Sequence, residues 1–382
     1  MILFLSDIAW GNLYQRPQQL AVRLARRERV LWVEPAVLGQ RMALAPVEQS
    51  PGLFRLTLPA IPFNARNRWI RRAAALAGSI GALRRLLAAL QGALLRRACR
   101  RIAVPAEEIV CLMENFMFLP LADAVHARRV VFDYIDDVFG FRALPPFMHE
   151  AWGAALRRAD TITVTSPTLG KRVAQASGRE ARLVPNGVEF DRFAGGAAPE
   201  RPGDFPETPF PVVVYIGAIY PWLDFPLMEK TLEALPDILF LFIGSVHPDA
   251  APLAARLSRF RNFRLLGQRP HGEIPGYLRP CHAGIIPFRR SLLTEGVNPV
   301  KLYEYSAAGL PAVATDFSDD TRAFADIVLI AHDEAEFAAH IRAAVARRGD
   351  AAFRRSLGKF ARANDWDRRA EEFTKLIHNQ AT

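Results

Sequence analysis

Short apolar runs alternate with helical stretches along this chain of 382 residues, and no other feature constrains its fold as strongly. One series of runs lies between Ile2 and Thr165, and a second lies between Val212 and Ile330. Strands and helices in alternation predict parallel β-α-β units, so the chain is expected to be an α/β protein. The expected strands are Ile2–Leu5, Val30–Val33, Ile109–Met113, Val130–Ile135, Thr161–Thr165, Val212–Ile216, Ile238–Ile243, Phe263–Leu266, Ala283–Pro287, Ala312–Thr315 and Ile327–Ile330.

The length of the chain indicates two domains, because a single core rarely extends over so many residues. The loop Ala194–Phe210 is rich in glycine, proline and alanine and is the natural boundary. The sequence predicts doubly wound, Rossmann-like domains over residues 1–193 and 211–355, a linker over 194–210 and a last helical segment over 356–382. Such sheets bind ligands at the carboxyl ends of their strands, so two facing domains would enclose a cleft for two substrates.

Cysteine usage and hydropathy limit the compartments in which the protein is expected. The three cysteines are scattered and odd in number, so neither a disulfide framework nor a zinc site is expected. This cysteine usage indicates a reducing compartment. The apolar run at the N-terminus is too short for a signal peptide, and no uninterrupted apolar stretch is long enough to span a bilayer. The protein is therefore expected in the cytoplasm or on a membrane surface.

The basic character of the chain comes from one segment. The formal net charge is +10, and residues 65–101 contain ten arginines but no lysine or acidic residue. Leucines and isoleucines at three- and four-residue steps predict a basic amphipathic helix over residues 68–101, with Trp69 near its start. Such a helix suits an anionic bilayer, although its leucines could equally pack on the sheet while its arginines stay in water. One aromatic residue among so many arginines offers no stacking platform for nucleic acid, which is not expected as a partner.

A candidate phosphate-binding segment follows the expected strand Ala283–Pro287. Asn298 and Pro299 favour the start of a helix, because asparagine is a good N-cap and proline fits the first turn. A helix N-terminus attracts phosphate, and Lys301 adds a full positive charge. Glu304 lies one turn further on the same face, where its carboxylate could accept hydrogen bonds from two ribose hydroxyls. The alternative is an ordinary capped helix with a solvated lysine and glutamate.

Carboxylates gather where the expected strand Val130–Ile135 ends. Asp133, Asp136 and Asp137 could supply a general base, since crowded carboxylates raise one another's pKa toward a useful value. Asp136 is the first candidate for that base. Two alternatives remain open, because these carboxylates could instead cap the following helix or hold a metal ion.

Several of these segments, in this order, resemble a known family. The run from Asn298 to Glu304, Asn-Pro-Val-Lys-Leu-Tyr-Glu, is similar to the donor motif of bacterial glycosyltransferases with two Rossmann-like domains, the GT-B fold. Trp10 with the run Gln-Arg-Pro-Gln that begins at Gln15 resembles a subgroup that includes teichuronic-acid-type and other surface-polysaccharide transferases. Further matches are Val184–Val188, Tyr215–Gly217, Phe242–Gly244 and Ile285–Phe288. The likeness extends over nearly the whole chain.

The resemblance implies roles for individual residues and no metal or other cofactor. Many retaining members carry a second glutamate eight positions before the one that matches Glu304, but here that position is Gly296 and Glu295 is one residue early. The implied donor-binding residues are Gly217, Tyr220, Asn298, Lys301, Leu302 and Glu304. The implied catalytic residues are Asp133, Asp136 and Asp137, and those for the acceptor or a phosphate are Ser6, Trp10 and Arg16. The segment near Trp366 resembles the last helix of this fold, which returns to the N-terminal domain.

The function implied by the resemblance is transfer of a sugar from a nucleotide-diphospho-sugar to a glycan or lipid-linked acceptor in cell-surface polysaccharide synthesis. The enzyme would lie in the cytoplasm, peripheral on the membrane face, with residues 68–101 on the anionic lipid. Two alternatives are a nucleotide-sugar epimerase with the same fold, and a protein that binds a membrane or nucleic acid through the arginine-rich segment. Fold likeness alone does not decide among them.

Overall fold

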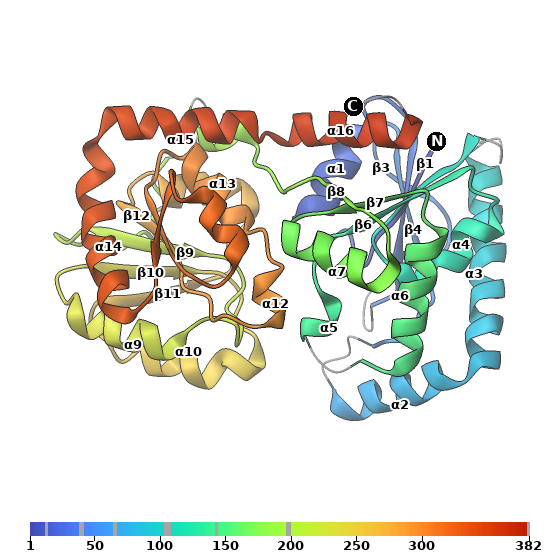
Figure 1. The fold of residues 1–382 in the computed structure, drawn as a ribbon, viewed down its shortest axis with the longest axis horizontal. Coiled ribbons are helices and arrows are strands. Elements are labelled where there is room, and N and C mark those ends of the chain that lie inside the picture. Colours follow the sequence, from blue (N-terminus) through green and yellow to red (C-terminus); the bar gives the residue numbers. More distant parts are fainter. Residues whose placement is uncertain are drawn as a thin grey trace. The chain divides into compact units, whose positions relative to one another are not determined.

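The computed structural model describes residues 1–11, 14–37, 42–63, 67–102, 108–141, 144–195 and 200–379. The chain divides into two compact units. Unit 1 contains Met1–Val184 together with Arg369–Thr382, and unit 2 contains Pro185–Arg368. Each unit is an α/β sandwich with helices around a largely parallel sheet (Figure 1). The expected fold class, two doubly wound domains, is confirmed.

The sheet of unit 1 has the strand order β3-β4-β2-β1-β5-β6-β7-β8, and every neighbouring pair is parallel except β3 and β4. Its central strands are apolar on both faces because helices cover both sides, which is typical of parallel sheets. The strands are β1 (Ile2–Leu5), β2 (Val30–Pro35), β3 (Val47–Ser50), β4 (Leu53–Leu58), β5 (Val110–Met113), β6 (Arg129–Tyr134), β7 (Thr161–Val164) and β8 (Arg182–Leu183).

The helices of unit 1 connect these strands (Figure 1). Proline opens several of them, since it is pre-organised for the first turn and needs no hydrogen-bond acceptor. They are α1 (Arg16–Leu24), α2 (Arg68–Ser79), α3 (Gly81–Arg101), the 3-10 helix η2 (Phe116–Phe118), α4 (Leu119–Ala124), α5 (Val138–Phe141), α6 (Pro146–Arg158) and α7 (Pro167–Ser177).

The basic segment 68–101 forms two helices, so the expectation of one continuous helix is wrong. Ile80 has extended backbone angles between α2 and α3, and the two axes are bent by 92°. Gly78 and Gly81 flank this break, and glycine favours a helix less than most residues do. Among the described helices none is by itself long and apolar enough to cross a membrane, although α2 and α3 pass that test as a bent pair.

The sheet of unit 2 is entirely parallel, with the order β11-β10-β9-β12-β13-β14. Its strands are β9 (Val212–Ile216), β10 (Leu239–Ile243), β11 (Phe263–Gly267), β12 (Ala283–Ile286), β13 (Ala312–Thr315) and β14 (Val328–Ala331). Its main helices are α8 (Phe190–Phe193), α9 (Phe225–Ala234), α10 (Ala251–Leu257), α11 (Ile274–Leu278), α12 (Leu292–Glu295), α13 (Val300–Ala307), α14 (Glu334–Ala346) and α15 (Ala351–Ala363). Short 3-10 turns, η3 (Pro248–Ala250), η4 (His271–Glu273), η5 (Asp319–Phe324) and η6 (Arg347–Gly349), join them.

The last helix, α16 (Trp366–His378), begins in unit 2 and ends in unit 1. Within unit 2, Trp366 is 2% exposed and packs on Gly187. Within unit 1, Phe373 is fully buried, and the guanidinium of Arg16 lies 5.3 Å from the centre of its ring. The expected return of the C-terminal helix to the N-terminal domain is confirmed.

The two units divide at Val184/Pro185, earlier in the chain than the loop 194–210 in which the sequence predicts the linker. Residues 196–199 of that loop lie outside the described residues. The physical reason is local pairing, because Val188 forms a β-bridge with Asp365 and the N–H of Phe190 donates to the Asp365 carboxylate at 2.9 Å. These contacts attach residues 185–193 to unit 2.

Candidate active site

The helix α13 opens at the carboxyl edge of the unit 2 sheet. Pro299 is its N-cap residue and makes no side-chain cap. Asn298, expected as the cap, instead accepts hydrogen bonds from the Asn186 N–H at 2.8 Å and the Tyr303 hydroxyl at 3.0 Å. Its amide therefore fixes the loop 185–188 against α13 and leaves the first N–H groups of the helix without a side-chain cap.

Lys301 is a partly buried cation in the first turn of α13. Its ammonium lies 4.7 Å from the centre of the Phe288 ring and 5.3 Å from that of Tyr215. No described carboxylate forms an ion pair with it, although the charge of Glu304 acts on it from a distance. Burial lowers the pKa of Lys301 to about 8, and Glu304 opposes that shift. An anion placed here would restore the ordinary pKa of the ammonium.

Two glycines bring the backbone close to this lysine. Gly217 follows β9 with φ of +128°, a conformation that favours glycine, and a Cβ there would lie 3.6 Å from the Lys301 Nζ. A Cβ on Gly244, at the end of β10, would lie only 1.9 Å from the carbonyl oxygen of Gly217. Gly217 therefore leaves no side chain between the main chain and Lys301, and Gly244 allows the end of β10 to pack closely against Gly217.

Glu304 is 9% exposed, and its Oε1 lies 3.3 Å from the Nε2 of His271. The Nδ1 of His271 lies 3.6 Å from the Glu189 carboxylate. His271 was not predicted from the sequence, because a lone histidine in a polar loop carries no motif. Glu189 was not predicted either, since it comes to the site only through the pairing of 185–193 with unit 2.

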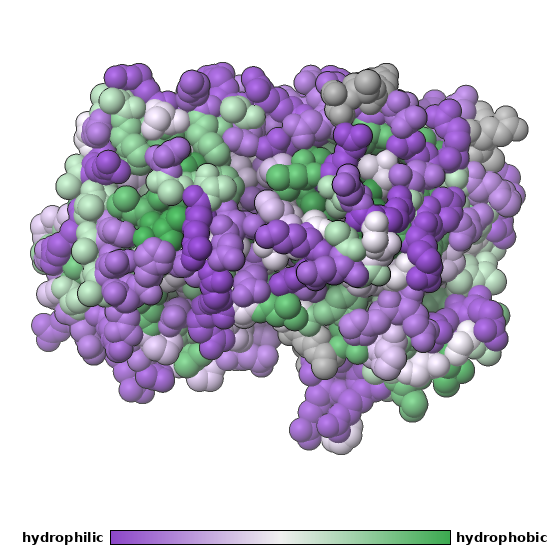
Figure 2. All heavy atoms as spheres, viewed as in Figure 1, coloured by the Kyte–Doolittle hydropathy of each residue, from purple (hydrophilic) through white to green (hydrophobic). Residues whose placement is uncertain are grey.

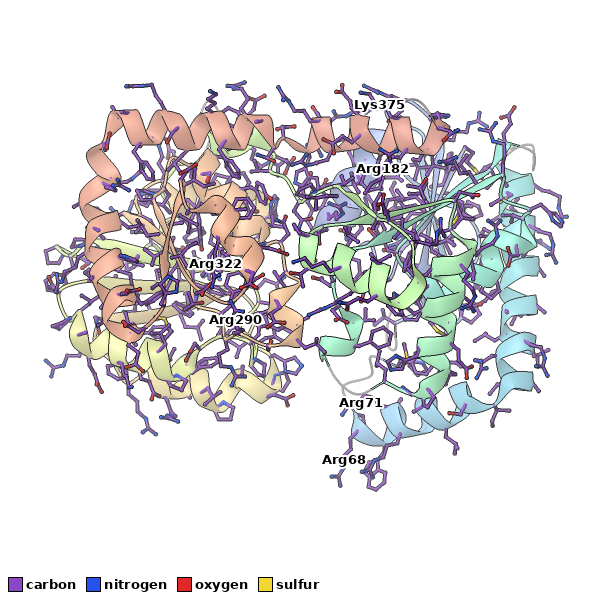
Figure 3. The ribbon with its side chains drawn as sticks, viewed as in Figure 1. Arg68, Arg71, Arg182, Arg290, Arg322 and Lys375 are labelled. Atoms are coloured by element: carbon purple, nitrogen blue, oxygen red, sulfur yellow. The ribbon has the colours of Figure 1, made fainter. Side chains whose placement is uncertain are left out.

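The remaining candidates of unit 2 differ in their surroundings. Tyr220 is stacked between Trp222, with ring centres 4.2 Å apart, and His247, at 4.3 Å. Leu302 is fully buried in the hydrophobic core, so its side chain supports α13 from below and does not reach the surface. Glu295 lies 4.0 Å from Arg290, which also pairs with Asp316 and Asp319 beyond β13 (Figure 3).

Asp133 lies at the carboxyl end of β6 in unit 1 and is bound within the fold. Arg16 donates to both of its carboxylate oxygens, at 2.8 and 3.1 Å, and the Thr163 hydroxyl donates at 2.6 Å. Arg16 and Asp133 are 3% and 1% exposed. The structure thus brings together an acceptor-side candidate and a catalytic candidate as one buried ion pair.

Asp137 is also held by its neighbours. It accepts hydrogen bonds from the N–H of Phe139 at 3.0 Å and the Tyr134 hydroxyl at 3.2 Å, and Arg172 forms an ion pair with it. The first of these bonds caps α5, which is one of the alternatives left open by the sequence.

Asp136 differs from both neighbours, because no described group donates a hydrogen bond to it and no described cation pairs with it. It is partly exposed, and desolvation by the surrounding protein together with the Asp7 carboxylate raises its pKa to about 7. Glu114, at the end of β5, is 8% exposed, and burial together with the charges of Asp133 and Asp7 raises its pKa well above the usual range. Glu114 was not predicted from the sequence, because it is a single glutamate after a short strand and belongs to no motif.

Ser6 and Trp10 form part of the local framework after β1. Ser6 is fully buried, and its hydroxyl donates to the carbonyl of Ile8 at 3.1 Å. The Trp10 N–H donates to Glu34, which also accepts from the Trp32 indole at 3.0 Å and from the Thr57 hydroxyl at 2.9 Å. Within the described part of the chain no group of acidic, histidine or cysteine residues has the arrangement of a metal site.

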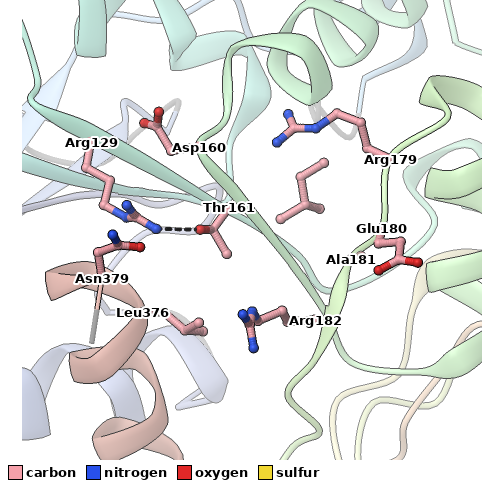
Figure 4. A pocket seen from close by; sticks show the side chains of 10 residues that line it. Arg129, Asp160, Thr161, Arg179, Glu180, Ala181, Arg182, Leu376 and Asn379 are labelled. Atoms are coloured by element: carbon pink, nitrogen blue, oxygen red, sulfur yellow. Dashed lines mark hydrogen bonds between the residues drawn. The ribbon is translucent and has the colours of Figure 1, made fainter. Parts of the chain in front are cut away.

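A polar cavity of about 500 Å³ lies at the opposite edge of the unit 1 sheet, where β6, β7 and β8 begin (Figure 4). Its arginines are engaged by the fold, since Arg129 donates to the Thr161 hydroxyl at 2.8 Å and Arg179 donates to the carbonyls of Leu156 and Ala159. Asp160 and Glu180 also line it, so it presents no clear single charge. The cavity lies away from the carboxyl ends at which such sheets bind ligands.

The arginine-rich helices expose apolar side chains. Leu76, Leu86 and Trp69 are 70%, 69% and 61% exposed, whereas the buried face of α2 and α3 is built from Ala74, Gly78, Gln91, Gly92, Leu95, Ala98 and Cys99. Arg68 and Arg71 extend from α2 (Figure 3), and apolar and polar side chains alternate over this element (Figure 2). Leu76, Leu83, Leu86 and Leu90 therefore remain on the surface, whereas Leu94 and Leu95 pack against the core of unit 1.

The fold and the donor-side sequence define the class of this protein. Residues 210–347 match the family of glycosyl transferases, group 1. Both units have solved counterparts in sucrose-phosphate synthase of Thermosynechococcus elongatus, with a TM-score of 0.73, 16% identity and coverage of 99% of this chain and 98% of that one. The Anabaena protein HepE, solved with UDP and glucose, gives 0.66 at 13% identity, covering 99% of each chain. The chain therefore has the GT-B fold, and its matched C-terminal part shows an enzyme of the glycosyltransferase class, which transfers a sugar from a nucleotide-sugar.

A sequence relative gives a finer comparison. Over 277 residues the chain is 28% identical to TuaH of Bacillus subtilis, a protein named for a glycosyltransferase role in teichuronic acid biosynthesis. The match covers 68% of this chain and 70% of TuaH. The expected resemblance to teichuronic-acid-type transferases is confirmed as a distant homology.

Proposed function

We propose that the enzyme transfers a sugar to a glycan or lipid-linked acceptor during synthesis of a cell-surface polysaccharide. The similarity to TuaH supports this acceptor class. In this proposal the donor binds the domain 211–355 and the acceptor binds the domain 1–193. The nucleotide-sugar donor serves as co-substrate, and the reaction needs no metal or other cofactor.

The observation that carries the donor site is Lys301, a partly buried ammonium without a carboxylate partner in the described part of unit 2. A buried charge is costly unless it is paired, so such a lysine favours an anionic ligand. The diphosphate would lie between Lys301, the N–H groups that open α13 and the backbone at Gly217. There the positive charge would stabilise the negative charge that develops on the leaving diphosphate.

The other donor contacts follow from this placement. Glu304 would accept hydrogen bonds from the ribose hydroxyls, one turn along α13 from the diphosphate. Tyr220, in its aromatic stack, would border the nucleotide or the sugar. Asn298 and Leu302 would act indirectly, because one fixes the loop before α13 and the other packs beneath it.

On the acceptor side, the contacts favour Asp136 as the base. Asp133 and Asp137 are each held by a cation, whereas Asp136 has no described partner and its pKa is raised to about 7. A base with that pKa can accept the proton of the acceptor hydroxyl near neutral pH. Arg16 would position Asp133 instead of clamping a phosphate, and Ser6 and Trp10 would support the same loops.

We further propose that α2 and the first half of α3 lie on an anionic membrane surface. The exposed leucines and Trp69 would enter the interface, and the arginines would meet lipid phosphates. Each arginine near such a surface contributes roughly 1 kcal/mol. This contact would hold the enzyme peripherally on the cytoplasmic face, where a lipid-linked acceptor is found.

A ligand screen tests the donor proposal. Melting temperatures are measured with nucleotide-sugars, nucleoside diphosphates and the corresponding nucleosides, since a specific ligand stabilises the protein in proportion to its binding free energy. We expect one nucleotide family to raise the melting temperature in the wild type and not in Glu304→Gln. If no nucleotide-sugar stabilises the wild type, the donor site is wrong.

A further inference from the structure

We propose that His271 is a positioning residue that holds the Glu304 carboxylate for the donor and makes donor affinity depend on pH. The inference rests on the proposed donor site, and it adds a regulatory group that the donor motif does not contain. His271 belongs to η4, which precedes α11, about thirty residues before that motif in the sequence.

The geometry places the imidazole between two carboxylates. Its Nε2 lies 3.3 Å from Glu304 Oε1, and its Nδ1 lies 3.6 Å from Glu189 Oε2. The side chains of His271 and Glu304 are 21% and 11% exposed, so water screens this contact only partly. The Phe193 ring, 5.7 Å away between centres, packs against the imidazole and limits its rotation.

The charges around His271 favour its protonated form. Burial alone would lower the pKa of His271, but the hydrogen bond and charge of Glu304 and the charge of Glu189 outweigh it and raise the pKa. Arg192, on α8 beside Glu189, opposes them. Glu304 on α13, Glu189 and Arg192 are thus the charged groups that act on His271.

A protonated His271 has two effects on the donor. It fixes one oxygen of Glu304 by a charge-assisted hydrogen bond and leaves the other free for ribose hydroxyls. It also offsets negative charge that would repel an anionic nucleotide. Because its folded pKa is raised, this support is complete at low pH and is lost as the pH rises through that pKa.

The test compares wild type with His271→Gln. Glutamine keeps a hydrogen-bond donor but has no charge at any pH. Calorimetric titration uses whichever of UDP, GDP, ADP and CDP binds the wild type most tightly, from about pH 6 to about pH 9. Lys301 and the nucleotide titrate alike in both proteins, so the ratio of the two affinities isolates His271. We expect wild type to bind roughly tenfold more tightly at the lowest pH and the ratio to approach one at the highest.

A matched control is His332→Gln, because His332 also lies 3.3 Å from a carboxylate, that of Asp316, but is 59% exposed and outside the donor site. Its ratio to wild type should stay constant. A second variant, Glu189→Gln, should move the fall in affinity to lower pH, since it removes one charge that raises the pKa of His271. This variant also serves if His271→Gln does not fold.

A constant ratio for His271→Gln, or an unmoved profile for Glu189→Gln, overturns the inference. If Glu304→Gln then still weakens nucleotide binding, the proposed donor site survives. If wild type binds none of the four nucleoside diphosphates, or if Glu304→Gln binds them normally, the donor site and the inference both fall.

Discussion

A cation lies at the carboxyl edge of the sheet in each unit, Arg16 in unit 1 and Lys301 in unit 2, and the surroundings of the two differ. In unit 1, Arg16 is 3% exposed and is neutralised by Asp133 through two hydrogen bonds. In unit 2, the Lys301 ammonium lies against the rings of Phe288 and Tyr215 and forms no ion pair with a described carboxylate, and burial lowers its pKa to about 8. An unpaired buried charge costs free energy, whereas a paired and hydrogen-bonded one is largely compensated.

The difference separates a structural charge from a binding charge. Arg16 and Asp133 neutralise each other within the fold, so this pair fixes the loops of unit 1. In the proposed donor site Lys301 is left for a ligand, and the diphosphate of the donor would supply the missing negative charge. The carboxylates of unit 1 differ among themselves in the same way. Asp133 and Asp137 are each paired with a cation, whereas Asp136 has no described partner.

The largest expected effect in unit 1 comes from the carboxylate without a partner. Asp136→Asn should lower turnover by roughly 10²–10⁴-fold, the usual contribution of a positioned general base, with little change in donor affinity. Steady-state transfer and donor titration measure the two quantities. The control is Asp123→Asn, which removes a carboxylate that is 58% exposed on the same unit.

The same residue predicts a pH profile. A base must be deprotonated, so turnover should rise with pH through about 7 and this step should be absent in Asp136→Asn. A variant that keeps both the rate and the step would assign the base to another group, of which Glu114 is one described candidate.

Breaking the paired cation should affect folding more than ligand binding. Arg16→Met leaves Asp133 buried without its partner, which typically costs about 3–5 kcal/mol of unfolding free energy. The double variant Arg16→Met with Asp133→Leu should recover most of that loss, as measured by urea unfolding. If Arg16→Met unfolds like wild type but loses acceptor affinity, Arg16 is a ligand-binding residue and the comparison fails.

The smallest expected effect concerns the membrane surface. Replacing Leu76 and Leu86 together by serine removes exposed apolar area and should weaken binding to vesicles with anionic lipid by roughly tenfold or more. Co-sedimentation measures it, and Leu183→Ser is the matched control because Leu183 is 49% exposed on β8 of the same unit. Equal loss in the control, or no loss in either, removes the membrane from the proposal.

The sequence predicted the strands whose residues are uniformly apolar. Ile2–Leu5, Val212–Ile216 and Ala312–Thr315 match β1, β9 and β13 without a shift, because strands buried on both faces have little pattern other than hydrophobicity. It missed β3 and β4, where Glu48 and Arg55 interrupt the apolar run in an antiparallel pair at the edge of the sheet. The break at Ile80 was also missed, because the apolar stripe continues through it.

The candidate site was predictable where chemistry follows local sequence. Lys301 and Glu304 lie about one turn apart on a single helix, so their spacing alone placed them together. The pairing of Arg16 with Asp133, 117 positions apart, could not be read in this way, nor could the contact between His271 and Glu304. Such contacts depend on which strands are neighbours, and the sequence gives no direct sign of that order.

The most direct test of the account asks whether Lys301 contributes to binding of the diphosphate group and not to binding of the nucleoside. Affinities for a nucleoside diphosphate and for its uncharged nucleoside are measured by calorimetry in wild type and in Lys301→Met. We expect the variant to lose roughly 100-fold in affinity for the diphosphate, since a charge-assisted contact is removed, and to bind the nucleoside as wild type does. Equal affinities of the two proteins for the diphosphate, or equal losses for both ligands, would contradict the account.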